Sequence, residues 1–221
     1  MKRRAILVGG AAAAAAAGLW WAMPRGAVTE LPALASPARA EDAAAPAVPD
    51  MVLGNPDAPV TVVEYASFTC PHCANFHANV WGEFRKNYVD TGKVRFVYRE
   101  VYFDKFGLWA AMVARCGGEM RYFGIADMIY DTQRDWIGDG TDATIAANLR
   151  KIGLKAGMTA DQVDACLNDN AMARAMVEAF QKNSAADGVE GTPTFLINGE
   201  KHSGEMSYAD FAALVDAKLG G

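Results

Sequence analysis

The cysteine pair in Cys70-Pro71-His72-Cys73 constrains the fold of this 221-residue chain more than any other feature. The segment before it, 59–68, is apolar and rich in β-branched side chains, which predicts a buried strand. The segment after it has large apolar side chains every four residues, which predicts a helix that begins at Cys70. These side chains are Phe76, Val80, Phe84 and Tyr88. Pro71 stands in the first helical turn, where its missing N–H leaves no hydrogen bond unmade.

A cysteine at the start of a helix is suited to thiol–disulfide exchange. Unpaired N–H groups and the positive end of the helix dipole stabilise a thiolate there, so the pKa of Cys70 is expected below its ordinary value. His72 could add a positive charge or an N–H donor. Cys73 lies one turn further and should be the less exposed thiol, which resolves mixed disulfides. Because a stabilised thiolate favours the reduced pair, Pro71 and His72 are interpreted as favouring disulfide donation.

Three other uses of these cysteines have different requirements. A zinc site needs about four ligands, and only His72 or His77 could join the two sulfurs. Covalent haem attachment needs a histidine directly after the second cysteine, and residue 74 is Ala. A purely structural short-loop disulfide remains an alternative, but it does not explain a strand followed by a helix.

The remaining pattern predicts an α/β chain interrupted by a helical block. The predicted elements follow in chain order: a strand at 93–103, helices over 106–187, a strand at 194–197, a hairpin turn at Asn198-Gly199, an edge strand at 201–203 and a helix capped by Ser207. Within the block, Gly117-Gly118 predicts a break, and Thr159 with Gln162 predicts a capping box. Without the block, a βαβ unit is followed by a ββα unit.

The first 40 residues are interpreted as a signal peptide or a membrane anchor. A basic start, 2–4, precedes 19 uncharged residues, 5–23, and a small-x-small cleavage pattern follows at 38–40. Since 19 residues nearly suffice to span a bilayer, an uncleaved anchor is the alternative to cleavage. Residues 41–50 are predicted to be an Ala/Pro-rich linker. A cleaved signal peptide and an uncleaved anchor would both place the chain after residue 40 in the periplasm or another extracytoplasmic compartment.

Charge excludes one class of partner. Five of the 21 basic residues and one of the 26 acidic residues lie in the first forty positions, so the chain from Glu41 has a net charge of −9. An acidic body offers no basic surface for phosphates, and we therefore expect no nucleic acid partner. The sequence gives no sign of a cofactor or a resident metal, and we expect a monomer.

The two remaining cysteines, Cys116 and Cys166, lie in the helical block. In an oxidising compartment an even number of cysteines favours pairing, so we expect a structural disulfide between them. Two buried free thiols are the alternative. A bond across this separation could stabilise the fold by roughly 4 kcal/mol.

Two segments resemble the DsbA family of periplasmic thiol–disulfide oxidoreductases. Residues 64–73, Glu64-Tyr65-Ala66-Ser67-Phe68-Thr69-Cys70-Pro71-His72-Cys73, match the surroundings of the family's cysteine pair. Residues 191–199, Gly191-Thr192-Pro193-Thr194-Phe195-Leu196-Ile197-Asn198-Gly199, match its cis-proline loop and the following strand. The resemblance covers 51–221 in element order. It implies a thioredoxin-like fold with an inserted all-helical domain.

In that fold, residues 51–105 and 188–221 would form the thioredoxin-like domain and 106–187 the helical insertion. The resemblance implies that Cys70 is the nucleophile and Cys73 the resolving thiol. It also implies that Pro193 is cis and that Thr192 and Pro193 offer their backbone to an extended substrate.

The resemblance places Glu64 where the family keeps a buried acidic residue, which could accept and return the proton of Cys73. The basic partner that some members pair with this acid is not clearly matched. Arg99 is a candidate, although we favour a solvated side chain. An apolar substrate groove is expected near Cys70 from Phe68, Phe76 and Val189, with Phe76 the one more readily assigned to the core.

As a function, the resemblance implies donation of the Cys70–Cys73 disulfide to unfolded or reduced exported proteins. A membrane redox partner would then reoxidise the pair. Two alternatives remain open: an isomerase or reductase kept in its reduced form, since Thr192 also occurs in those branches, and a copper-handling thiol protein.

Overall fold

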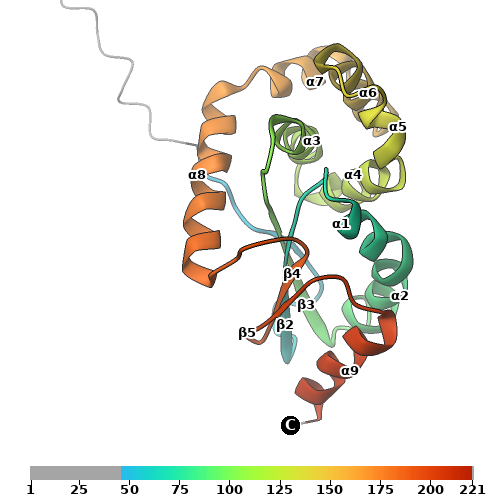
Figure 1. Ribbon diagram of the computed structural model, residues 1–221, viewed down its shortest axis with the longest axis vertical. Coiled ribbons are helices and arrows are strands. Elements are labelled where there is room, and N and C mark those ends of the chain that lie inside the picture. Colours follow the sequence, from blue (N-terminus) through green and yellow to red (C-terminus); the bar gives the residue numbers. More distant parts are fainter. Residues whose placement is uncertain (1–45, 221) are drawn as a thin grey trace, which may run out of the picture. The chain divides into compact units, whose positions relative to one another are not determined.

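The computed structural model describes residues 46–220 of the chain (Figure 1). The predicted signal peptide or anchor and the first part of the predicted linker lie outside these residues. Among the residues described, no helix combines the length and the apolar character needed to cross a bilayer.

A mixed five-stranded sheet forms the centre of residues 46–220, with the order β1-β3-β2-β4-β5. The central strand β2 (Val60–Ala66) pairs in parallel with β3 (Val94–Glu100), and the other pairs are antiparallel. Strand β1 (Met51–Leu53) lies outside β3, whereas β4 (Thr194–Ile197) and β5 (Glu200–Ser203) lie on the other side of β2. Because β2 is paired with a strand on each side, the chain that leaves its carboxyl end starts from a fixed position.

One continuous helical run leaves this end of β2. It contains α1 (Pro71–Phe76) and α2 (Gly82–Phe84), each followed by a π-helical stretch, at His77–Trp81 and Arg85–Val89. The predicted apolar repeat faces the core along the whole run, and its four members are buried. In a π-helical stretch each hydrogen bond reaches one residue further than in an α-helix. The wider turns keep a four-residue repeat on one face.

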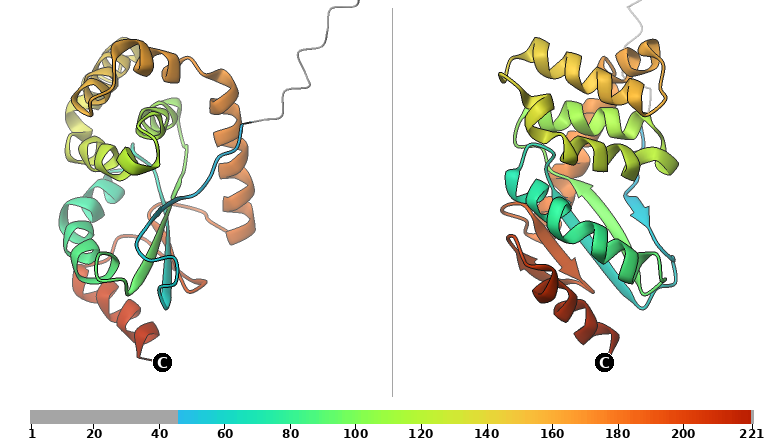
Figure 2. Two further views of the ribbon diagram at one scale, coloured as in Figure 1. Left: turned by 180° about the vertical axis from the view of Figure 1, so that it is seen from behind. Right: turned by 90° about the vertical axis from the view of Figure 1, so that its right-hand side faces the viewer.

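The helices between β3 and β4 are α3 (Lys105–Cys116), α4 (Glu119–Asp131), α5 (Gln133–Ile137), α6 (Asp142–Lys155), α7 (Ala160–Leu167) and α8 (Asn170–Asp187). Helices α3 to α7 gather at the end of the sheet where β2 leads into α1 (Figure 2). Helix α8 returns along one side of the sheet, and α1, α2 and α9 (Tyr208–Leu219) cover the other (Figure 1).

Local sequence signals fix where several of these helices begin. The Asp104 carboxylate accepts hydrogen bonds from two backbone N–H groups at the start of α3. The predicted capping box of Thr159 and Gln162 is confirmed at the start of α7. The predicted break is also confirmed, since Gly118, with φ 74°, separates α3 from α4. The predicted βαβ and ββα units with helices between them are therefore confirmed, while the exact domain boundaries stay a prediction.

A disulfide joins the end of α3 to α7 through Cys116 and Cys166, whose Cα atoms lie 6.0 Å apart. The two cysteines are separated by 50 positions along the chain, and α4, α5 and α6 lie in the closed loop. A cross-link of this kind limits the unfolded chain more than the folded one. The bond therefore contributes to the stability of the helical block without contacting the cysteine pair at α1.

We predict that replacing both Cys116 and Cys166 by Ala lowers the free energy of unfolding by about 4 kcal/mol, because the unfolded chain regains the entropy of a loop of this length. Chemical denaturation followed by circular dichroism measures this change, with the Cys70–Cys73 pair reduced in both proteins. An unchanged denaturation midpoint would contradict the prediction. Independently, the denatured wild-type protein should show two free thiols after mild reduction, not four.

Candidate active site

The two thiols of the Cys70–Cys73 pair sit in different surroundings. Cys70 is the N-cap residue of α1, with extended backbone angles of φ −78° and ψ 122°, and its side chain is partly exposed. Cys73 lies one turn inside the helix and is fully buried. The strand–turn–helix context that the sequence predicts therefore exposes one sulfur and encloses the other.

The pKa of the Cys70 thiol is lowered to about 5. A hydrogen bond from the Cys73 thiol is the largest cause, and the partial burial of Cys70 opposes it. The Thr192 hydroxyl, which has no other hydrogen-bond partner among the described residues, and the backbone N–H groups of His72 and Cys73 also favour the thiolate. Near neutral pH the reduced Cys70 is therefore an anion.

The pKa of the Cys73 thiol shifts in the opposite direction. Burial is the main cause, because an anion at this position would lose its hydration. The hydrogen bond to Cys70 and the negative charge of Glu64 raise this pKa further. Cys73 therefore holds its proton tightly, and any reaction that uses its sulfur as a nucleophile needs a group that removes the proton.

The loop before β4 faces the exposed sulfur. The peptide bond between Thr192 and Pro193 is cis, and Cys70 Sγ lies 3.5 Å from the Thr192 carbonyl oxygen. The Thr194 hydroxyl donates to the Gly191 carbonyl, and Gly204 N–H donates to the Pro193 carbonyl. The backbone on both sides of Pro193 is thereby held beside Cys70.

His72 projects outward from the first turn of α1. Its Nδ1 atom lies 3.0 Å from a carboxylate oxygen of Glu205. This hydrogen bond raises the pKa of His72, and the negative charge of Cys70 acts in the same direction. The protonated imidazole would in return favour a thiolate at Cys70. The sequence suggested this role for His72, but nothing in the pattern pointed to Glu205.

Glu64 lies in the middle of β2, paired in register with Tyr98 and Phe195, and its side chain is completely buried. The basic side chain nearest to it is His77, with 3.7 Å between Nε2 and a carboxylate oxygen. From the sequence, His77 was a candidate only for a zinc site. Its position four residues after Cys73, hence on the same helical face, was the signal that could have placed it here.

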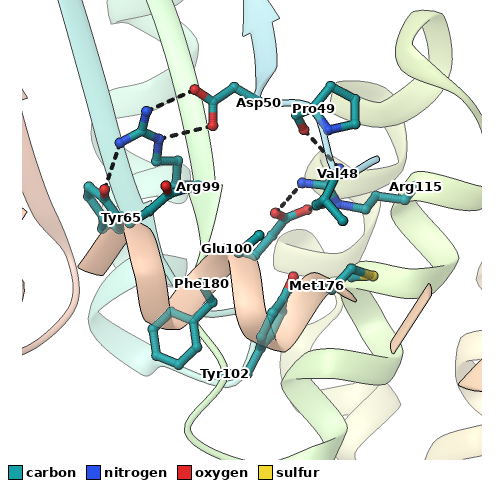
Figure 3. A pocket seen from close by; sticks show the side chains of 12 residues that line it. Val48, Pro49, Asp50, Tyr65, Arg99, Glu100, Tyr102, Arg115, Met176 and Phe180 are labelled. Atoms are coloured by element: carbon teal, nitrogen blue, oxygen red, sulfur yellow. Dashed lines mark hydrogen bonds and ion pairs between the residues drawn. The ribbon is translucent and has the colours of Figure 1, made fainter. Parts of the chain in front are cut away.

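Arg99 is not the partner of Glu64, and it is not a solvated side chain. Its guanidinium group binds the Asp50 carboxylate with two hydrogen bonds of 2.9 Å and donates another to the Tyr65 hydroxyl (Figure 3). It also contacts the Asp187 carboxylate. The carboxylates come from the chain before β1 and from the end of α8. Arg99 therefore fastens two outer segments to the sheet, and the last residues of the predicted linker are held in place.

The end of β3 holds a second buried acid, on the opposite face of the sheet from Arg99. This acid, Glu100, receives two hydrogen bonds from the guanidinium group of Arg115 in α3, which lies beside it (Figure 3). A third hydrogen bond comes from the Tyr122 hydroxyl. Arg115 also binds the Pro49 carbonyl. Both charged groups of this network are paired, as buried charges in folded proteins usually are.

Gln133, the first residue of α5, connects the helical block to the cysteine pair, and the sequence interpretation did not single it out. Its buried side-chain amide donates to the backbone carbonyls of Phe68 (2.8 Å) and Cys70 (3.0 Å). A single glutamine in a helical stretch gives no signal for this role, because its partners are 65 and 63 positions away.

The predicted apolar groove is not formed by Phe68 and Phe76, because both rings are buried in the core. Phe68 packs against Tyr130, and Phe76 against Phe195. A hollow of about 380 Å³ instead lies beside the helix start, where α1 meets the α4–α5 turn. Pro71, Asn75, Tyr130, Gln133 and Arg134 are among the residues that line it.

The chain is similar to known proteins over this whole region. Residues 47–217 match the thioredoxin family. A Rickettsia bellii protein named as a protein-disulfide oxidoreductase is 34% identical over 151 residues, which are 68% of this chain and 57% of the relative. A Rickettsia felis protein named in the same way is 33% identical over 171 residues, which are 77% of this chain and 60% of the relative. The chain thus spans less than two thirds of these relatives.

Solved structures share the fold. Alpha-DsbA1 of Wolbachia pipientis has a TM-score of 0.72 and 28% identity, over 79% of this chain and 93% of that one. A protein-disulfide isomerase of Novosphingobium aromaticivorans has a TM-score of 0.70 and 26% identity, over 78% of this chain and 98% of that one. The predicted thioredoxin-like fold with a helical insertion is confirmed. The chain belongs to the thioredoxin family and, within it, to the DsbA-like proteins.

Proposed function

We propose that this chain is a thiol–disulfide oxidoreductase of the cell envelope that donates the Cys70–Cys73 disulfide to exported proteins. The observation that carries the proposal is the opposite behaviour of two neighbouring sulfurs. The pKa of Cys70 is lowered to about 5, whereas burial and the Glu64 charge raise the pKa of Cys73. One sulfur is suited to leave or attack as an anion, and the other to hold a proton until it is removed.

The Cys70 thiolate supports donation as the direction of the reaction. The folded reduced protein gains stability from a Cys70 pKa below that of an unfolded thiol. This gain is fully present above the unfolded thiol pKa and is lost as the pH falls through about 5. Near neutral pH the thiolate therefore stabilises the reduced form relative to a pair with an ordinary thiol, and such stabilisation makes the disulfide a stronger oxidant.

The surroundings of Cys70 support an extended polypeptide as the substrate. The cis Thr192–Pro193 segment lies beside the sulfur, and its backbone could pair with a substrate strand without regard to the substrate's side chains. Thr192 and Pro193 would then bind the substrate backbone while Cys70 exchanges its disulfide. This arrangement suits a broad set of unfolded proteins.

The proposed location rests on the N-terminal pattern and on the second disulfide. A basic start followed by uncharged residues 5–23 is typical of export. The Cys116–Cys166 bond would persist in an oxidising compartment. Since each donated disulfide leaves Cys70 and Cys73 reduced, sustained activity needs an oxidant. We propose that a membrane redox partner supplies it.

We predict that the oxidised protein converts reduced, unfolded ribonuclease to a disulfide-containing form with a yield of one disulfide per chain. The favoured Cys70 thiolate drives the transfer. Counting the thiols of separated ribonuclease measures the yield, and a Cys70→Ser variant is the inactive control. Reshuffling of scrambled ribonuclease without oxidation of the reduced form would favour the isomerase. Tight Cu(I) binding without any exchange would favour copper handling.

A second prediction concerns the cause of the low Cys70 pKa. Replacing Cys73 by Ala removes the hydrogen-bond donor to the Cys70 thiolate, whereas Cys73→Ser keeps a hydroxyl donor. We expect the Cys70 pKa to be higher in the Ala variant than in the Ser variant by on the order of one pH unit. The pH dependence of iodoacetamide alkylation measures both values. Equal values would show that the helix start alone stabilises the thiolate.

A further inference from the structure

Two buried side chains beside the cysteine pair, Glu64 and His77, lack hydrogen bonds. Within residues 46–220, both carboxylate oxygens of Glu64 and both ring nitrogens of His77 are buried without a hydrogen-bond partner. The side chains are 0% and 5% exposed. Buried polar atoms are almost always paired, because an unpaired one loses its hydration without compensation. Two such groups facing each other indicate a role other than stability.

On its inner side, this pair faces the core that holds the buried Cys73, four residues before His77 on the same helical run. The Glu64 charge is close enough to raise the pKa of Cys73. The hydroxyls of Tyr98 and Tyr130, which face the same cluster, are hydrogen-bonded to each other at 2.6 Å. The His77 ring stacks on the Tyr130 ring with 4.0 Å between centroids. The tyrosines therefore enclose the cluster, and among the basic side chains of residues 46–220 only His77 lies within 4.0 Å of the Glu64 carboxylate.

On its outer side, His77 faces a second acid near the surface. Its Nδ1 atom lies 4.0 Å from a carboxylate oxygen of Asp127 in α4, whose side chain is 34% exposed. The same oxygen accepts a hydrogen bond from Trp81 Nε1, and Arg85 lies 3.7 Å from the other oxygen. A hollow of about 240 Å³ opens here, lined by His77, Trp81, Gly82, Arg85, Asp127 and Asp131. One imidazole thus lies between the buried acid and the surface.

The proposed reaction requires a proton at Cys73 in every cycle. A substrate thiolate attacks Cys70 Sγ, the S–S bond to Cys73 breaks, and Cys73 leaves as an anion that takes up a proton. A second substrate thiolate then attacks the substrate sulfur and releases Cys70 as its thiolate. During reoxidation the Cys73 thiol loses its proton, attacks the Cys70 sulfur of the new mixed disulfide and expels the partner's thiolate. Because Cys73 is fully buried, water cannot exchange this proton directly.

We propose that His77 carries protons between Glu64 and the hollow at Asp127, and thereby connects the Cys73 thiol to solvent. A neutral imidazole suits this task, because one ring nitrogen accepts a proton while the other donates one. The distances of 3.7 Å and 4.0 Å exceed hydrogen bonds, so each transfer needs a small approach or one bridging water. His77 acts on the sulfur through Glu64, so it is a positioning residue.

This inference rests on the proposed function, and its test separates the two. We predict that His77→Ala slows the reaction in which Cys73 displaces glutathione from Cys70 by about 100-fold, the lower end of what a positioned proton transfer contributes. The mixed disulfide is followed by quenched flow and mass spectrometry. Val80→Ala is the matched control, because Val80 is buried on the same helical run and has no titratable side chain. It should slow the step by less than about threefold.

Added imidazole gives a readout that a structural role would not move. In His77→Ala the missing ring leaves a space next to the hollow at Asp127, so imidazole in the buffer should restore the rate at least about tenfold. It should leave Val80→Ala unchanged. In a Glu64→Gln background the removal of His77 should have no further effect on the rate, because the relay then lacks its inner member.

Three outcomes would overturn the inference: equal slowing by His77→Ala and Val80→Ala, no recovery with imidazole, or additive effects of the Glu64 and His77 substitutions. Each of them leaves the proposed function standing if wild-type protein still oxidises ribonuclease. Iodoacetamide alkylation of Cys70 in His77→Ala should keep its wild-type pH dependence. If the wild-type protein shows no exchange at all, the proposed function fails and the relay fails with it.

Discussion

The hydrogen bond from the Cys73 thiol to the Cys70 sulfur at the start of α1 is the interaction on which the site depends. It is the largest cause of the low pKa of Cys70, about 5, and it adds to burial, which is the main cause of the raised pKa of Cys73. Both effects need a helix that begins at Cys70, so that one cysteine stands at the open end and the other one turn inside. The thiolate at Cys70 and the need for a proton route to Cys73 therefore both follow from the position at which α1 begins.

The rest of the fold keeps this helix start in position. The central strand β2 leads directly into it. In the helical block, the Gln133 side chain donates hydrogen bonds to the backbone carbonyls of Phe68 and Cys70. The cis Thr192–Pro193 segment lies on the remaining side. These supports come from parts of the chain that lie far apart in the sequence. Changes in the helical insertion can therefore alter the reactivity of Cys70 without touching its sulfur.

The sequence predicted whatever depends on neighbours within a few positions. The strand before Cys70, the capping box at Thr159 and the break at Gly118 rely on local hydrogen bonds and backbone preferences, and all are present. Strand β1 was missed, because three residues carry too short a pattern and pair only through β3. The partners of Arg99 and Gln133 were missed for the same reason: long-range pairing leaves no periodic trace.

A four-residue repeat predicted the buried face of the helical run after Cys70, but not the π-helical turns that keep this repeat on one face. In a purely α-helical run, twelve residues would rotate that repeat by about 120° away from the core.

The contrast between two buried glutamates strengthens the functional interpretation of one of them. Glu100 on β3 has an arginine, a tyrosine hydroxyl and three hydrogen bonds, which is how this fold satisfies a buried charge. Glu64 on the adjacent strand β2 has none, although two tyrosines and a histidine surround it. A group that must bind and release a proton within each cycle cannot be held by strong fixed donors, because they would stabilise one protonation state. The lack of hydrogen bonds at Glu64 and His77 is therefore what a proton route requires.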